Sequence, residues 1–328
     1  RIFDLEEFIM PYEKFDVSKI ELEPIANKEN LTNLSDIRAL SDPVPEFDSP
    51  ALVDVAERVK AAHARGRQVV MIMGAHVIKV GMSRYVIDLM ERGIVTHIAL
   101  NGAGMIHDFE LAMVGGTAES VPQNIKTGRF GMWRETSELN EIAKAAADED
   151  IGLGEAVGRA AAGFKHADIS ILAAGYRLGV PVTVHVAIGQ DIVHEHPNCD
   201  GAAIGKATYN DFLIFTNTIS KLEGGAMLCF GTAVMGPEVY LKALSMVRNA
   251  ARRTGESIAH FTTAVFDLIA LPDDITKEAP KTDAAYYYRP WKTILIRTVA
   301  DGGESFYVQG DHRVTIPNLW KMVTQGAD

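Results

Sequence analysis

The sequence contains little cysteine and fewer basic than acidic residues. Cys199 and Cys229 are the only cysteines among 328 residues, too few for a disulfide framework or for a zinc site built from thiolates. The chain has 32 Lys and Arg residues and 43 Asp and Glu residues. The resulting net charge of −11 argues against a nucleic-acid-binding protein. No apolar run reaches the roughly 18–20 residues of a membrane span. We therefore expect a cytoplasmic protein with neither nucleic acid nor membrane as a partner.

Two familiar catalytic signatures are also absent. The chain has no G-x-S-x-G elbow, which excludes the usual serine hydrolase arrangement, and neither cysteine has the context of a papain-type nucleophile. Cys229 lies in the apolar run AMLCF, where we expect it to be a small buried hydrophobic residue.

Short apolar runs followed by glycine-bearing turns and helical segments recur along the chain. The runs VVMIM (69–73) and VTHIAL (95–100) both show this pattern, which is typical of β-α-β units. We predict an α/β fold: a Rossmann-like, doubly wound, mostly parallel sheet with helices on both faces. Residues 1–48 are interpreted as an arm that packs on its own chain or on a neighbour, and residues 49–328 as one domain. Further strands are expected at 181–188, 226–230, 260–266, 293–299 and 305–310.

Ligands of such sheets bind beyond the carboxyl ends of the strands, so the turns located there are candidate sites. The turn NGAG (101–104) can present backbone N–H groups to a phosphate at the start of a helix. Strand-to-helix turns often contain glycine simply because their backbone needs a positive φ. The motif by itself is therefore weak evidence for phosphate binding.

The loop at 194–205 is long, polar and rich in possible ligands. His194 and His196, together with Asp200 and with His185 in the preceding strand, could hold a metal ion. The alternative is a polar loop whose histidines make ordinary hydrogen bonds. We favour the alternative, so the prediction includes no metal site.

Lys292 lies in the aromatic stretch YYYRPWKT. Such surroundings can favour an uncharged lysine that forms an imine with a substrate. The other interpretation is a solvated lysine whose alkyl stem lies on an aromatic ring.

Five stretches resemble segments of the deoxyhypusine synthase family. They are HVIKVGMSRYVIDLMERG (76–93), GIVTHIALNGAGMIHDFELAM (93–113), HPNCDGAAIGKATYNDFLIF (196–215), HFTTAVFD (260–267) and SFYVQGDHRVTIPNLW (305–320). This resemblance implies a Rossmann-like fold, NAD as the cofactor, and oxidation of a polyamine followed by transfer through a lysine imine. It also implies a homo-oligomer, a dimer or tetramer, whose active sites lie between subunits.

The resemblance also implies site residues. Lys292 would be the imine-forming residue, and Glu238 stands nearest the place of the histidine base that the family uses. The implied cofactor-binding positions are Ala75, His76, Gly102, Ala103, Gly104, Asp108, Asp200, Gly201, Thr263, Ala264, Asp267 and Asp311.

The predicted function is therefore NAD-dependent oxidation or transfer acting on an amine of polyamine type or on another small molecule. Because the family's histidine base is missing, a nucleotide-binding protein of the same fold without turnover is the first alternative. A metal-dependent enzyme that uses His194, His196 and Asp200 is the second.

Overall fold

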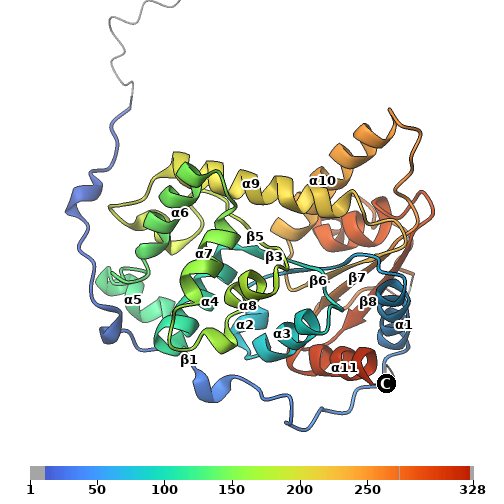
Figure 1. The fold of residues 1–328 in the computed structure, drawn as a ribbon, viewed down its shortest axis with the longest axis horizontal. Helices are drawn as coiled ribbons and strands as arrows, with labels where there is room; N and C mark the ends of the chain where they lie inside the picture. Colours follow the sequence, from blue (N-terminus) through green and yellow to red (C-terminus); the bar gives the residue numbers. More distant parts are fainter. Residues whose placement is uncertain (1–11, 273, 326–328) are drawn as a thin grey trace, which may run out of the picture.

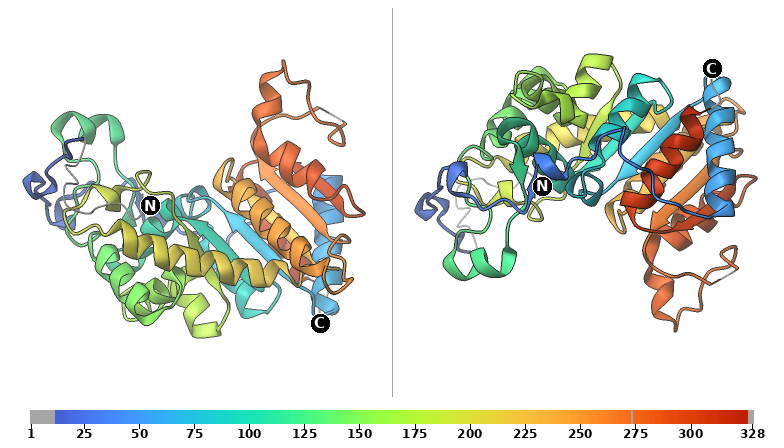
Figure 2. Two further views of the ribbon diagram at one scale, coloured as in Figure 1. Left: turned by 90° about the horizontal axis from the view of Figure 1, so that it is seen from above. Right: turned by 90° about the horizontal axis from the view of Figure 1, so that it is seen from below.

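The central feature of the protein is a six-stranded sheet in which all neighbouring strands run parallel. The computed structural model describes residues 12–272 and 274–325 (Figure 1). Helices cover both faces of the sheet, which confirms the predicted Rossmann-like α/β fold (Figure 2). In spatial order the strands are β5 (Val182–His185), β3 (His97–Asn101), β2 (Val69–Met73), β6 (Ala226–Phe230), β7 (Thr262–Asp267) and β8 (Glu304–Gln309).

Counted along the chain, these six strands have the spatial order 3-2-1-4-5-6 of dinucleotide-binding Rossmann domains. The direction of winding reverses between β2 and β6, which pair in register from Val69 with Ala226 to Met73 with Phe230. Both strands are buried along their whole length, because each face carries a hydrophobic core.

Alternate residues of the strands contribute to two separate cores. Met71 and Met73 pack with the helices of one face, whereas Val70 and Ile72 pack with those of the other. The first face carries α1 (Pro50–Ala64), α2 (His76–Lys79), α3 (Ser83–Glu91), α4 (Gly102–Val114), α7 (Leu153–Ala161), α8 (Ile171–Leu178) and α11 (His312–Thr324). The second carries α9 (Gly201–Ile219), α10 (Met235–Ala251) and the π-helix η7 (Pro290–Arg297). The remaining α-helices of the described residues are α5 (Val121–Thr127) and α6 (Glu138–Glu149).

The strand expected at 293–299 is wrong, because most of this run belongs to η7. Trp291, Ile294 and Leu295 lie in the second core. A short apolar run fits a buried strand and a buried helix equally well, and Pro290 in the first turn favours the helix. Cys229, by contrast, is buried in β6 as expected, with 1% of its surface exposed.

The predicted arm packs on its own chain from Glu23 onward, whereas residues 12–19 are exposed. β1 (Thr32–Asn33) pairs antiparallel with β4 (Gly116–Thr117), and Glu23 forms an isolated bridge with Trp133. The division into an arm and one domain at 49–328 stays a prediction. Among the helices of the described residues, none has both the length and the apolar composition needed to cross a membrane.

Candidate functional site

The backbones that leave β2 and β6 meet at the point where the winding reverses. A β-carbon on Gly74 would lie 2.4 Å from the carbonyl oxygen of Gly231. Gly231 itself has φ +56°, a conformation that side chains other than glycine rarely adopt. The two glycines therefore allow the backbones after β2 and β6 to approach each other closely at the carboxyl edge. A larger residue at either position would prevent this approach.

His312 lies beside this crossing. It is the first residue of α11, and its Nε2 would be 2.6 Å from a β-carbon on Gly231. Its ring centroid is 5.8 Å from that of Phe230 and 6.0 Å from that of His76. The His312 side chain is 5% exposed, and its Nδ1 has no hydrogen-bond partner among the described residues.

The environment of His312 keeps its imidazole neutral. Burial, assisted by His76, lowers the pKa of His312 to about 4, and the charges of Asp267 and Asp311 only partly offset this effect. A neutral imidazole has one nitrogen that donates and one that accepts. The buried Nδ1 is therefore a polar atom that a ligand could satisfy.

The structure brings four of the predicted cofactor-binding residues to this region: Ala75, His76, Asp267 and Asp311. Asp267 ends β7 and accepts a 2.6 Å hydrogen bond from the Tyr288 hydroxyl. Asp311 caps α11, and its hydrogen bond with the Arg313 guanidinium lowers the Asp311 pKa to about 2. Ala75 and His76 form the turn after β2. These residues follow β2, β7 and β8 at one edge of the sheet.

The predicted positions Gly102, Ala103 and Gly104 form the first turn of α4. The Asn101 side chain caps this helix by accepting a 2.8 Å bond from Gly104 N. The carboxylate of Asp191, from the loop after β5, covers the turn, because a β-carbon on Gly102 would lie 1.9 Å from Asp191 Oδ2. The turn is therefore not the open phosphate cradle that its sequence suggests.

Three other predicted positions are enclosed by the protein. Asp108 is 1% exposed and accepts hydrogen bonds from Ser170 Oγ, Ile171 N and Leu172 N, so its carboxylate holds the start of α8. Thr263 and Ala264 are fully buried inside β7, and the Thr263 hydroxyl donates to the Ile294 carbonyl. None of the three reaches the open edge.

Asp200 and Gly201 lie at the start of α9. Asp200 Oδ1 accepts from Ala202 N and Ala203 N at 2.9 and 3.1 Å, so it is a helix cap. The preceding Asn198 bonds to Ser137 and Glu141 around the start of α6.

The histidines of this loop also have local partners. His194 Nδ1 accepts from Asp191 N, and His196 Nε2 lies 2.7 Å from the Gly131 carbonyl. Within residues 12–272 and 274–325, no group of three His, Cys, Asp or Glu residues could hold a metal ion.

The two predicted catalytic residues lie on neighbouring elements. Glu238, in the first turn of α10, pairs with Lys242 and with Arg289, the residue before η7. The Lys242 hydrogen bond in particular lowers the pKa of Glu238, which makes it a weak base. Lys292 in η7 places Nζ 4.1 Å from the ring centroid of Tyr286, a cation–π contact.

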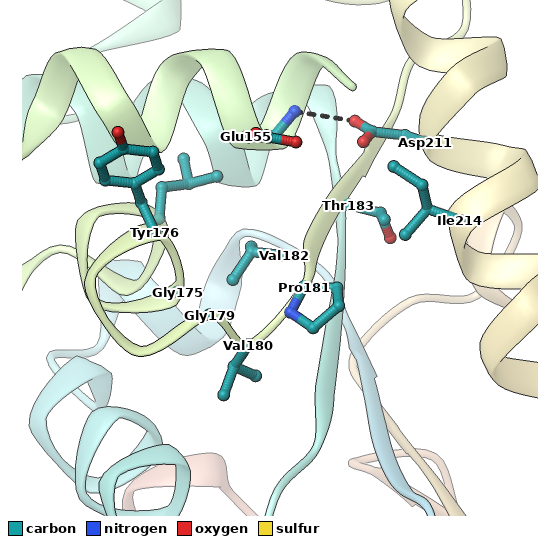
Figure 3. A pocket seen from close by; sticks show the side chains of 12 residues that line it. Glu155, Gly175, Tyr176, Gly179, Val180, Pro181, Val182, Thr183, Asp211 and Ile214 are labelled. Carbon is teal, nitrogen blue, oxygen red and sulfur yellow. Dashed lines mark hydrogen bonds between the residues drawn. The ribbon is translucent and has the colours of Figure 1, made fainter. Parts of the chain in front are cut away.

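A pocket of about 300 Å³ lies at the outer edge of the sheet, where β5 begins (Figure 3). Asp211 of α9 lies at its wall and accepts 2.8 Å bonds from Gly154 N and Val184 N. These bonds satisfy backbone donors beside the edge strand. The pocket is therefore separate from the carboxyl edge at β2 and β6.

Sequence reasoning missed His312, and it did not include Gly74, Gly231 and Asp191 among the predicted site residues. His312 had a usable signal, because it follows the helix cap Asp311 directly after a predicted strand. No sequence signal indicated the role of Asp191, since its contact with Gly102 joins two distant parts of the chain.

No protein-family model and no curated protein matches this chain. Among solved structures it is similar to ArgZ, an arginine dihydrolase from the ornithine-ammonia cycle in cyanobacteria, with TM-score 0.50 and 13% identity over 86% of this chain. The chain spans about a third of ArgZ, 34% of its length. A conserved protein from Methanococcus maripaludis S2, assigned as LOR/SDH, gives TM-score 0.49 and 13% identity over 87% of this chain and 73% of that one.

A protein from Entamoeba histolytica, assigned as a deoxyhypusine synthase, gives TM-score 0.41 and 8% identity, covering 85% of this chain and 89% of that one. At these identities the likeness to ArgZ shows a shared fold and nothing about activity. Membership of the deoxyhypusine synthase family stays a prediction.

Proposed function

We propose that this chain binds NAD where β2 and β6 meet and uses it to oxidise a small amine. The observation that carries the proposal is the buried, unsatisfied Nδ1 of His312, at the place where Rossmann domains of this strand order bind dinucleotides. The sequence resemblance to an NAD-dependent family points to the same cofactor.

The residues at this edge fit a dinucleotide in part. His76 and His312 offer ring nitrogens, whereas the space beside Gly74 and Gly231 is filled by the Gly231 carbonyl and by His312 Nε2. The usual G-x-G-x-x-G turn is absent, and β3 ends in Asn101 where an acidic residue commonly holds the ribose. Asp267 and Asp311, at the ends of neighbouring strands, would have to supply that carboxylate.

When bound, NAD would accept a hydride from the substrate. The chain itself would supply position. His312 is neutral at pH 7 and can exchange a hydrogen bond with the bound ligand, while its lowered pKa makes it a weak base. The nearby carboxylate of Asp267 attracts a cation toward the same edge, whereas that of Asp311 is paired with Arg313.

Binding is tested by titrating the full chain with NAD and NADH in a calorimeter. We expect wild-type protein to bind, and His312→Ala to bind at least about tenfold more weakly, since a ligand hydrogen bond is lost. His63→Ala is the control, because His63 is an exposed residue of α1. Absence of dinucleotide binding, or equal affinity of His312→Ala and wild type at equal melting temperature, would overturn the proposal.

The pairing of Glu238 with Lys242 and Arg289 favours a second candidate, a nucleotide-binding protein without turnover. Such a protein would bind NAD but reduce none of it when amines are added. Formation of NADH, followed by its absorbance, separates the two candidates.

A further inference from the structure

A second cavity lies beside the proposed NAD site, over the first turns of α4. Its volume is about 220 Å³, and it is lined by the arm, α2, α4, the segment around α5 and the loop after β5. Because α4 begins at the end of β3, the neighbour of β2, this cavity opens at the same carboxyl edge. Its size suits a small metabolite.

Three charged residues that line this cavity form no ion pair within the described part of the chain: Lys79, Asp191 and Glu119. The ammonium of Lys79, an exposed residue of α2, forms no hydrogen bond with another described residue. The other cation there, Lys28, is paired with Glu110 at 2.5 Å. The Glu119 carboxylate already accepts hydrogen bonds from three neutral donors of residues 124–133. The charges left for a ligand are therefore one ammonium and one carboxylate.

The charges and the burial at this cavity shift the pKa values of two groups on its wall. Burial, with the charges of Lys79 and Lys28, lowers the pKa of His107 on the cavity wall to about 3. Burial raises the pKa of the Asp191 carboxyl to about 6, so this group is ionised at neutral pH but poorly solvated. A ligand that neutralises it would relieve that cost.

The remaining wall is largely apolar. Ile106, Val121 and Phe130 line the cavity, and Ile106 is 4% exposed. These side chains suit the alkyl part of a ligand.

We propose that this cavity binds a small zwitterion, whose ammonium faces Asp191, whose carboxylate faces Lys79 and whose alkyl chain lies on the apolar wall. The inference rests on the proposed function, because it names the substrate class of that site. A polyamine would leave Lys79 facing another cation, whereas a simple carboxylic acid would leave Asp191 facing another anion. A zwitterion satisfies both residues at once.

Three ligands of matched length test this inference. Norleucine carries both charges, pentylamine lacks its carboxylate and hexanoate lacks its ammonium. Calorimetry at about pH 8, where Asp191 is ionised, measures the three affinities in the absence of dinucleotide. We expect norleucine to bind at least about tenfold more tightly than either analogue.

Two substitutions assign the charges. Asp191→Asn should reduce the preference for norleucine over hexanoate by about tenfold or more, and Lys79→Met should do the same for the preference over pentylamine. Matched controls are Asp148→Asn and Lys126→Met, which change exposed residues that do not line the cavity and should leave both preferences intact. Melting temperatures confirm that each variant is folded.

The outcomes separate this inference from the proposed function. If NAD binds but norleucine binds no better than its analogues, the zwitterion site is wrong and the NAD proposal stands. If norleucine binds with the expected charge preferences but NAD does not bind, the cavity assignment stands and the proposed function fails. Wild-type ligand preferences in both Asp191→Asn and Lys79→Met would overturn the assignment of the charges.

Discussion

The Nζ of Lys28 lies 2.5 Å from Oε2 of Glu110, and both side chains are buried. The pair joins the N-terminal arm to α4. Glu110 also accepts hydrogen bonds from the hydroxyls of Thr117 and Thr136, at 2.6 and 2.8 Å. The carboxylate is thus fully compensated, and the arm is part of the wall of the cavity over α4.

Replacing Lys28 by methionine should destabilise the protein strongly. The substitution leaves the Glu110 charge buried with only two neutral donors, and breaking a buried pair in this way costs about 3–5 kcal/mol. Urea unfolding measures the loss. Arg58→Met is the control: it breaks an exposed pair with Glu304 and should cost about 1 kcal/mol or less. Equal losses of unfolding free energy in the two variants would show that the buried Lys28 pair stabilises the protein no more than the exposed pair does.

Gly74→Ala should disturb the carboxyl edge. Its new methyl group would meet the Gly231 carbonyl at 2.4 Å, and a backbone atom between two paired strands has little freedom to move. We expect a lower melting temperature and weaker NAD binding. Gly205→Ala is the control, because a β-carbon there meets nothing within 4 Å in helix α9, and it should stabilise the protein by up to about 1 kcal/mol. An unchanged melting temperature for Gly74→Ala would contradict the close approach.

Asp211 should make stability depend on pH. Burial raises its pKa to about 8, from an ordinary 3.8, despite hydrogen bonds from Val184 N and Gly154 N. Between these values the folded chain keeps a proton that the unfolded chain has released, so wild-type stability falls as the pH rises. The free energy of unfolding of Asp211→Asn, relative to wild type, should therefore rise by roughly 1.4 kcal/mol per pH unit between about pH 5 and 7.

Denaturant unfolding at several pH values measures this difference. Asp148→Asn, at an exposed position of α6, should show no such slope. A flat difference for Asp211→Asn would mean that Asp211 titrates normally in the folded protein.

The two cysteines should differ in reactivity. Cys199 is partly exposed, whereas Cys229 is buried in β6, where burial raises the thiol pKa. An aromatic disulfide reagent should label one thiol in native protein and two in urea, because the reactive species is the thiolate. Cys199→Ser should abolish the native signal. Rapid labelling of two thiols in the folded protein would contradict the burial of Cys229.

How far the sequence predicts the fold depends on which interactions decide each element. The run 69–73 is apolar at every position, and this local pattern identified a strand covered on both faces. The run 293–299 is also apolar, but its contacts with α10 and β7 select a π-helix instead. Short apolar runs carry no period that would separate these outcomes.

In the candidate site, too, the sequence predicts the location of some residues but not the orientation of others. Ala75, His76, Asp267 and Asp311 are positions that the family resemblance implies, and they do lie at the carboxyl edge. Asp108 has the right sequence context but points inward to cap α8. A motif does not reveal which way its side chain faces.

Composition and apolar patterning by themselves determined the α/β class, the buried Cys229 and most of the strands, because these depend on neighbours along the chain. Only the tertiary structure decided the order of the strands, the contact of Gly231 with His312, and the position of Asp191 over Gly102. These relationships join segments far apart in the sequence. The free energy of these contacts comes from packing between distant segments. A local sequence pattern therefore does not predict them.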